Sequence, residues 1–248
     1  MARAAPVLAY RTLDSTNAEA RRLAEAGETG PLWISADTQT AGRGRRERAW
    51  TAPAGNLSAT LLLTLDRSPA QAAEIAFVAA LAAGDLAALY VPEALVRLKW
   101  PNDVMLDGQK LCGILIESGR TPRGQLWLAI GIGVNLVAAP SNIERPATAL
   151  ADHLRVGVER PPSPQEALAV LAEAFAGWQD RWQAQGFDVV RAAWSARAEG
   201  MGGPCTARLD RETVTGVAEG LDHDGALILR LSDGSTRRIT AGDVFFGG

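Results

Sequence analysis

Three stretches of the chain carry the start signals of helices. Each begins at Ser or Thr followed three residues later by Glu or Gln, the spacing of a capping box, and Thr16 is the expected cap of the first. In the other two, proline follows the capping serine and favours the first helical turn. Glycine at positions 27 and 186 can end the first and third helices. We predict helices over residues 17–26, from about 69 to 90 and from 164 to 186, and a short one over 189–197.

Apolar runs and alternating patterns predict strands between and after these helices. The connections are short, with turn residues such as Asp107-Gly108, so consecutive strands are expected to pair antiparallel rather than in a doubly wound parallel sheet. The predicted strands cover residues 32–36, 57–65, 96–100, 104–106, 110–117 and 125–136.

After Gly200 the helix signals stop and four short strands are predicted. Short strands at this spacing are typical of a small barrel. We therefore expect two domains, residues 1–200 and residues 201–248. The four strands cover residues 204–210, 213–221, 226–231 and 237–241.

Residues 37–56 form a long polar stretch without periodicity, and long loops of this kind are usually functional or disordered. Its centre reads Gly42-Arg43-Gly44-Arg45-Arg46. Glycine lets backbone N–H groups approach a ligand, and arginine offers a planar fork to phosphate oxygens. The segment is neither a Walker A loop nor a dinucleotide fingerprint. Taken alone, it is equally compatible with a solvated basic loop or a nucleic-acid contact.

A second polar group lies where two predicted strands meet. Asn102 and Asp103 follow a proline at a strand end, a common place for binding and catalytic side chains. Lys110 opens the next strand, and Gly113 within that strand can mark close approach by a ligand. Lys110 could neutralise a carboxylate or a phosphate beside that gap. For each residue alone, an ordinary turn or an exposed lysine explains the pattern as well.

The last strand of the first domain is unusually open on one face. Gly131 and Gly133 alternate, so both lack a side chain on the same face, which Asn135 shares. Such a face can receive a ligand or pack tightly against a helix.

Composition and charge exclude several classes of protein. The chain has 248 residues, of which 47% are hydrophobic and 21% charged, and a net charge of −3. These values suit a globular protein and give no overall electrostatic reason for nucleic-acid binding. The longest apolar run, residues 75–83, is too short for a membrane span, and residues 1–10 lack the apolar core of a signal peptide.

Cysteine and histidine are scarce. The two cysteines, Cys112 and Cys205, and two histidines form no group with metal-ligand spacing. We expect no tightly bound structural metal, no disulfide scaffold, and a reducing cytoplasmic location. Cys112 is expected to be a small buried residue, and the three tryptophans between residues 178 and 194 are expected to pack helices.

Five segments, in order, resemble the biotin protein ligase family, and the resemblance runs from about Leu8 to the C-terminus. It implies an α+β fold, with a mixed, mainly antiparallel sheet packed with helices as in class II synthetase-like biotin and lipoate ligases. A small SH3-like C-terminal β-barrel completes it. The segments are L-D-S-T-N at 13–17, Q-T-A-G-R-G-R-R at 39–46 with Trp50, K-W-P-N-D at 99–103, K-L-C-G-I-L-I-E at 110–117 and G-I-G-V-N-L at 131–136.

The resemblance implies an activity in two steps. Biotin and ATP, with Mg²⁺ to screen the polyphosphate, would give biotinyl-5′-AMP and pyrophosphate. Biotin would then pass to a lysine of a biotin carboxyl carrier protein domain. About a dozen residues precede Leu13, so no helix-turn-helix headpiece and no repressor role are expected. Neither nucleic acid nor membrane is an expected partner, and the chain is expected to be a monomer or a weak homodimer.

The resemblance also implies roles for particular residues. Lys110, Asp103 and Arg45 would be catalytic: Lys110 would contact the carboxylate and α-phosphate, and Asp103 would orient or deprotonate the acceptor lysine. Biotin would be bound by Ser15, Thr16, Asn17, Gln39, Gly42, Arg43, Trp50, Lys110, Gly113 and Gly133. The nucleotide and its phosphates would be bound by Arg43, Arg45, Arg46, Asn102, Lys110 and Asn135.

The sequence leaves three alternative functions open. A lipoate ligase or octanoyl transferase of the same fold would not need the polar group Ser15, Thr16 and Gln39 for a linear acyl chain. A non-catalytic biotin or nucleotide sensor would not need both Lys110 and Asp103. A nucleic-acid-binding module predicts steep salt dependence and conflicts with the acidic net charge.

Overall fold

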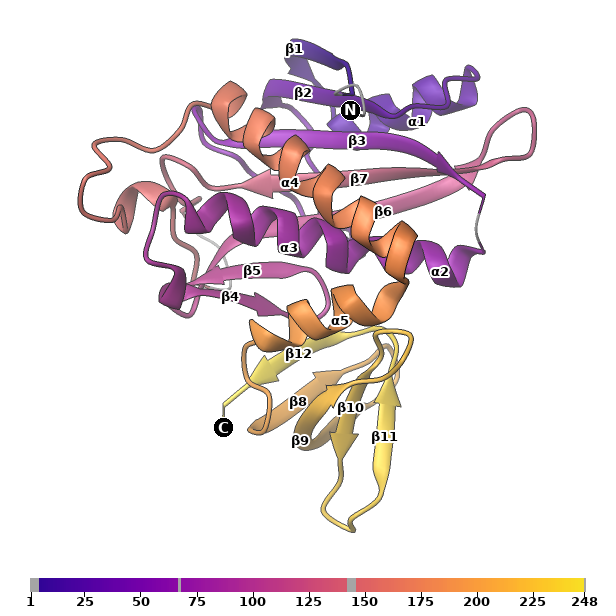
Figure 1. The fold of residues 1–248 in the computed structure, drawn as a ribbon, viewed down its shortest axis with the longest axis vertical. Coiled ribbons are helices and arrows are strands. Elements are labelled where there is room, and N and C mark those ends of the chain that lie inside the picture. Colours follow the sequence, from indigo (N-terminus) through magenta and orange to yellow (C-terminus); the bar gives the residue numbers. More distant parts are fainter. Residues whose placement is uncertain (1–4, 67, 142–145, 248) are drawn as a thin grey trace.

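The computed structural model describes residues 5–66, 68–141 and 146–247. Seven strands form one mixed sheet in the order β1-β2-β3-β7-β6-β5-β4 (Figure 1). Only the β1–β2 pair in this sheet is parallel, joined through helix α1, and every other neighbouring pair is antiparallel. The strands are β1 Val7–Leu13, β2 Leu32–Gln39, β3 Leu57–Leu65, β4 Val96–Lys99, β5 Asp103–Leu106, β6 Gln109–Arg120 and β7 Leu126–Val134.

The two faces of this sheet are covered by different helices. Alternate strand residues point to opposite faces, so Trp33 joins the main core while its neighbours Leu32 and Ile34 pack with α1. On the main-core side, α3 and α4 lie across the sheet (Figure 1). The helices are α1 Thr16–Glu25, α2 Pro69–Ala73, α3 Ile75–Ala88, α4 Pro164–Gln185 and α5 Phe187–Ala196.

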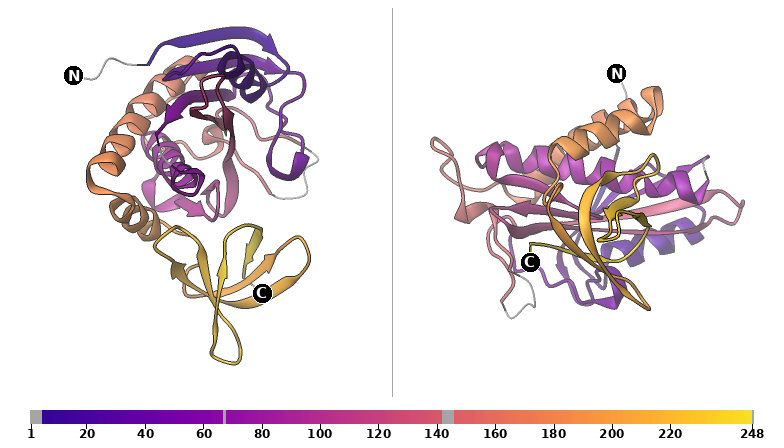
Figure 2. Two further views of the ribbon diagram at one scale, coloured as in Figure 1. Left: turned by 90° about the vertical axis from the view of Figure 1, so that its right-hand side faces the viewer. Right: turned by 90° about the horizontal axis from the view of Figure 1, so that it is seen from below.

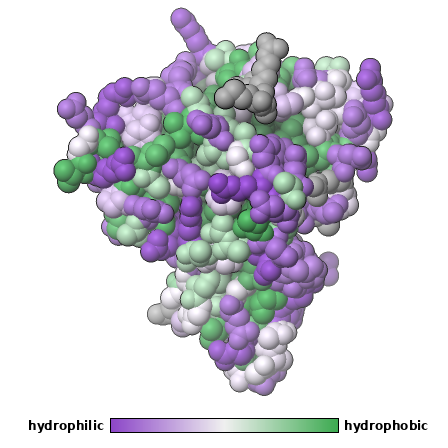
Figure 3. Space-filling model, in the orientation of Figure 1, coloured by the Kyte–Doolittle hydropathy of each residue, from purple (hydrophilic) through white to green (hydrophobic). Residues whose placement is uncertain are grey.

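Helix α3 is apolar on all sides because the sheet and α4 enclose it. The stretch Gln71–Ala88 is long and apolar enough to cross a membrane by length and composition, and 67% of it is buried within the fold. A continuously apolar helix buried in this way is a core helix. The tryptophans of α4 and α5 pack here as expected, and Trp178 and Trp182 donate through Nε1 to Asp85 and Glu74. On the face seen in Figure 3, hydrophilic and apolar side chains are interspersed.

The C-terminal part forms a separate five-stranded antiparallel sheet in the order β11-β10-β9-β8-β12 (Figure 2). It packs beneath α5, where Phe77 makes edge contacts with Phe187 and Trp194. Trp100 Nε1 donates to Gly225 O at 3.0 Å and ties β4 to this sheet. The strands are β8 Pro204–Arg208, β9 Thr213–Leu221, β10 Leu227–Arg230, β11 Thr236–Ile239 and β12 Asp243–Phe246.

Several sequence-based elements need correction. Strand β1 was not predicted, because as an edge strand it is mostly exposed and lacks an apolar pattern. Strand β12, residues 243–246, was not predicted either. The cap of α1 is Ser15 rather than Thr16: the Ser15 side chain accepts from the Ala18 N–H, and Thr16 is the first helical residue. The helix expected from 69 to 90 is divided into α2 and α3 at Glu74.

Candidate active site

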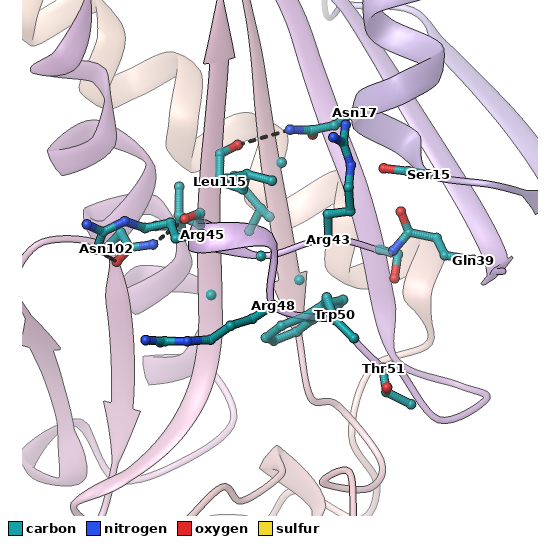
Figure 4. Close-up of a pocket in the computed structure, with 18 of the residues that line it drawn as sticks. Ser15, Asn17, Gln39, Arg43, Arg45, Arg48, Trp50, Thr51, Asn102 and Leu115 are labelled. Carbon is teal, nitrogen blue, oxygen red and sulfur yellow. Dashed lines mark hydrogen bonds between the residues drawn. The ribbon is translucent and has the colours of Figure 1, made fainter. Parts of the chain in front are cut away.

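A cavity of about 270 Å³ lies on the face of the sheet that carries α1. Its walls come from the start of α1, the end of β2, the basic loop, the start of β3, the first half of β6 and the end of β7. Figure 4 shows Ser15, Asn17 and Gln39 on one side and Arg45, Arg48 and Asn102 on the other. Segments that are far apart in the sequence therefore meet around one space.

Glycines in β6 and β7 make room for this cavity and for the side chains around it. Strand pairing places Gly113 opposite Gly133 and Thr60 opposite Gly131. A Cβ at Gly133 would lie 2.4 Å from the Trp50 ring, and a Cβ at Gly131 would lie 2.3 Å from Asn17 Oδ1. The open face expected from the glycine alternation is thus partly filled by side chains of the chain itself.

The α1 end of the cavity is polar. Ser15 and Thr16 are brought beside Gln39 because β2 continues past its predicted end at 36 to residue 39. Gln39 Oε1 accepts from the Thr16 backbone N–H at 2.8 Å and lies 3.2 Å from the Thr16 hydroxyl. Hydroxyls and an amide at a helix N-terminus can bind a small polar group that both donates and accepts hydrogen bonds.

The opposite end is cationic. Arg45 donates to Asn102 Oδ1 at 3.0 Å and to Gly242 O at 3.1 Å, so both of these bonds go to neutral oxygens. Burial lowers the pKa of the Arg45 guanidinium, an effect that the nearby carboxylates of Asp243 and Asp103 oppose. A partly desolvated cation of this kind favours an anionic ligand.

Lys110 and Asp103 form an ion pair in the cavity, with 2.6 Å between Lys110 Nζ and Asp103 Oδ1. The turn between β5 and β6 brings the two together, and the Asp103 side chain is largely buried. Lys110 Nζ also lies 5.8 Å from the centroid of the Trp50 ring. The Trp50 Nε1 is buried and has no partner among the described residues, so this donor is available to a ligand.

The basic loop is held to the C-terminal sheet by acidic residues. Arg46 pairs with Asp210 at 2.9 Å and with Asp243 at 3.3 Å, and Arg48 also pairs with Asp243. Within the loop, a bridge between Arg43 and Ala49 gives it a hairpin-like shape. The loop is therefore ordered by contacts from a part of the chain about 200 residues away in sequence.

Most of the residues selected from the sequence line this cavity. They are Ser15, Thr16, Asn17, Gln39, Arg43, Arg45, Trp50, Asn102, Asp103, Lys110, Gly113, Gly133 and Asn135.

Gly42 and Arg46 are not among the lining residues. Gly42 O accepts from the Trp50 N–H at 2.9 Å, and a Cβ there would lie 2.4 Å from Trp50 O, so Gly42 shapes the loop. Arg46 turns to Asp210 and Asp243, as described above. Asn135 lines the cavity, but its amide also donates to Thr148 O at 3.1 Å.

Other lining residues were not selected from the sequence. Arg48 belongs to the same basic run and could have been included on that signal. The remaining ones carry no local signal, because they reach the cavity only through the fold. They include Thr51, Ser58, Pro140, Ala147 and Asp243.

One possible metal-binding group occurs among the described residues, and it lies outside the cavity. Asp222, His223 and Asp224 offer ligand atoms within 4.8 Å of one another on the C-terminal sheet. Arg238 pairs with both aspartates, so their charge is already compensated.

Comparison with known proteins gives the same identification over both sheets. Residues 8–135 match the biotin/lipoate A/B protein ligase family, and residues 201–247 match the biotin protein ligase C-terminal domain. The biotin–[acetyl-CoA-carboxylase] ligase of Paracoccus denitrificans is 45% identical over 95% of this chain and 98% of its own length. The enzyme of the same name from Mycobacterium tuberculosis is 34% identical over 93% and 85%.

Solved structures agree at the level of the fold. The biotin protein ligase from Aquifex aeolicus in complex with biotin and ATP superposes with a TM-score of 0.80 at 23% identity, covering 98% of this chain and 99% of that one. The family match, the identity to curated ligases and the matching C-terminal domain lead to one conclusion: the chain belongs to the biotin protein ligases of the biotin/lipoate A/B protein ligase family.

Proposed function

We propose that this chain is an ATP-dependent biotin protein ligase. It would convert biotin and ATP to biotinyl-5′-AMP and pyrophosphate, and then transfer biotin to a lysine of a biotin carboxyl carrier protein domain. The observation that carries the proposal is a single cavity with Ser15, Thr16 and Gln39 at one end and Arg45 and Lys110 at the other. Such a cavity suits a molecule with a neutral polar head group and a carboxylate tail.

Adenylation joins two anions, so its barrier is largely electrostatic. A carboxylate oxygen of biotin attacks the α-phosphorus of ATP, the bond from that phosphorus to the bridging oxygen breaks, and pyrophosphate leaves. Lys110 and Arg45 would neutralise the charge where the two reactants meet. Asn102 accepts a hydrogen bond from Arg45 and would keep its guanidinium aimed at the phosphate.

Mg²⁺ would screen the polyphosphate of ATP and balance the charge of the leaving pyrophosphate. Asp243 lines the cavity beside Arg48, and its carboxylate would exchange that arginine for the metal ion when ATP enters. Asp103, paired with Lys110, would act in the second step instead.

In the second step the acceptor lysine must attack as a neutral amine. Its nitrogen attacks the acyl carbon of the adenylate, the bond from that carbon to the phosphate oxygen breaks, and AMP leaves. Asp103 would orient the amine and take the proton that it loses. The side chain is largely buried, which keeps its carboxylate directed into the cavity.

We further propose that residues 1–200 form the catalytic domain and residues 201–248 a small accessory domain. The expected location is the cytoplasm, and the expected state is a monomer or a weak homodimer, without nucleic acid as a partner. Arg45 and Arg48, which contact Gly242 and Asp243, support a direct contribution of the accessory domain to the site.

The test is a pyrophosphate-release assay with Mg-ATP and biotin, lipoate or octanoate in separate reactions. We expect a burst close to one pyrophosphate per protein with biotin alone, because an adenylate held in the cavity limits release to one turnover. Labelling of a carrier domain then tests the second step. A burst with lipoate instead would assign the chain to lipoate activation, and tight biotin binding without any burst would indicate a sensor.

A further inference from the structure

Behind the polar end of the cavity lies a connected row of polar side chains, three of them buried and one, Glu117, half-buried. Glu117 accepts from Asn17 Nδ2 at 2.8 Å, and Asn17 Oδ1 lies 2.7 Å from the Thr60 hydroxyl. The Thr60 hydroxyl in turn lies 2.8 Å from that of Thr16, which lines the cavity. Thr60 is fully buried and does not line the cavity, so any effect on a ligand must pass through its neighbours.

The orientation of the Asn17 amide is determined by its surroundings. Its nitrogen faces the carbonyl oxygen of Leu115 (Figure 4) and the carboxylate of Glu117, and both groups only accept hydrogen bonds. Arg43 donates to Glu117 Oε1 at 3.0 Å, so both oxygens of this carboxylate act as acceptors. The Asn17 oxygen must therefore face Thr60. Gly131 is required here, because a side chain would occupy the position of this oxygen.

The hydroxyl protons then have one consistent arrangement. Asn17 Oδ1 has no proton, so the single Thr60 proton is donated to it. The 2.8 Å contact between Thr60 and Thr16 then needs the Thr16 proton. The contact from Thr16 to Gln39 is longer, 3.2 Å, and is left without a proton. The Thr16 oxygen consequently presents lone pairs, and not its proton, to the cavity.

Gln39 is oriented in a complementary way. Its Oε1 accepts from the Thr16 backbone N–H, which can only donate, so the NH₂ group of the amide is the part left for a ligand. The polar end of the cavity thus offers one acceptor and one donor side by side. A group with an N–H next to a C=O, as in a cyclic urea, matches this order.

We infer that Thr60, Asn17 and Glu117 are positioning residues that set the hydrogen-bond polarity of the polar end and select a head group with an N–H beside a carbonyl. This inference rests on the proposed function, because biotin has such a head group and a linear acyl chain does not. The three residues act through Thr16: Thr60 and Glu117 lie outside the cavity lining, and Asn17 lines the cavity with both its amide atoms bonded to the protein.

Calorimetric titration of biotin into the protein without ATP tests this inference. Thr60→Val keeps the shape of the side chain and removes the hydroxyl, and we expect biotin to bind roughly tenfold more weakly, as for one lost buried hydrogen bond. Thr60→Ser restores the hydroxyl and is expected to bind nearly as wild type. Thr121→Val removes another buried hydroxyl, in the β6–β7 hairpin, and should leave biotin affinity unchanged.

A second variant covers the case in which Thr60→Val does not fold. Glu117→Gln can donate as well as accept, so it no longer holds the Asn17 amide in one orientation, and we expect several-fold weaker biotin binding. The pyrophosphate burst at saturating biotin should stay close to wild type in Thr60→Val, because Lys110, Arg45 and Arg43 keep their partners.

The possible outcomes separate the two proposals. If wild-type protein binds biotin and Thr60→Val and Glu117→Gln bind it equally well, the polarity inference is wrong and the proposed function stands. Equal losses in Thr60→Val and Thr60→Ser would also overturn it, because the hydroxyl would not be the cause. If wild-type protein binds no biotin, the proposed function itself fails, and the inference with it.

Discussion

Lys110 and Asp103 illustrate how single residues acquire a role here. Each is the partner of the other at 2.6 Å, so each charge is compensated before any ligand arrives. A substrate that brings a carboxylate or phosphate can engage Lys110 and release Asp103 to act on an incoming amine. This ion pair would therefore take part in both proposed steps, Lys110 in adenylation and Asp103 in transfer.

Asp103→Asn should slow transfer of preformed biotinyl-5′-AMP to a carrier domain by about a hundredfold or more, the usual contribution of a general base. Adenylation should fall much less, because Lys110 and Arg45 remain. Rapid-quench measurement of the two steps separates the effects. Asp107→Asn, in the adjacent hairpin and outside the cavity, is the matched control and should leave both rates unchanged. Transfer at the wild-type rate in Asp103→Asn would remove Asp103 from the mechanism.

At the scale of elements, β6 and β7 contribute three glycines to the lining of the cavity. The main cluster of glycines is Gly113, Gly131 and Gly133, and each has a particular neighbour, either the Trp50 ring or the Asn17 amide. The alternating glycines seen in the sequence are therefore needed because the loop that carries Trp50 and the helix α1 pack directly against β6 and β7.

Gly133→Ala should displace the Trp50 ring, because the new Cβ would lie 2.4 Å from it. We expect biotin to bind at least tenfold more weakly, with a change in tryptophan fluorescence before any ligand is added. Gly177→Ala, at an exposed position in α4 with open space around it, is the control. It should leave biotin affinity unchanged and stabilise the fold by roughly 0.5–1 kcal/mol. Wild-type affinity and fluorescence in Gly133→Ala would show that Trp50 does not need this contact.

The predicted element boundaries differ from the observed ones for local reasons. Residues 57–65 and 213–221 were predicted as strands with their observed limits, because one continuous or alternating pattern covers each. Strand β1 could not be predicted, since it pairs on one edge only and its side chains are mostly exposed. The last three residues of β2 were assigned to the loop because they are polar, yet they pair with β1 and carry Gln39 into the cavity.

At the scale of the whole molecule, the C-terminal sheet completes the site. Asp243 and the carbonyl of Gly242 bind arginines of the loop between β2 and β3. Arg46 and Arg48 are thus paired with a carboxylate, and ATP phosphates would replace it as their partner. These contacts connect the C-terminal sheet to the seven-stranded sheet at the candidate active site.

Asp243→Asn should loosen this loop without unfolding either sheet. We expect trypsin to cut after the arginines at 43, 45, 46 and 48 roughly three- to tenfold faster than in wild type, in line with the loss of ion pairs worth about 1 kcal/mol. Mass spectrometry identifies the cut positions, and biotin with Mg-ATP should restore protection. Asp233→Asn, in another turn of the same sheet, is the control. Equal cleavage rates in all three proteins would mean that Asp243 does not hold the loop.

The sequence by itself determined the class of fold, most of the helices and strands, and the residue types of the site. These properties depend on local patterns: apolar periodicity, capping residues, turns and the five ordered motifs. Only the tertiary structure decided which of those residues meet. It brought Thr60 and Glu117 behind Thr16, turned Arg46 away from the cavity and carried Asp243 into it. Such contacts join residues up to 197 positions apart, and no pattern in a local stretch of sequence encodes them.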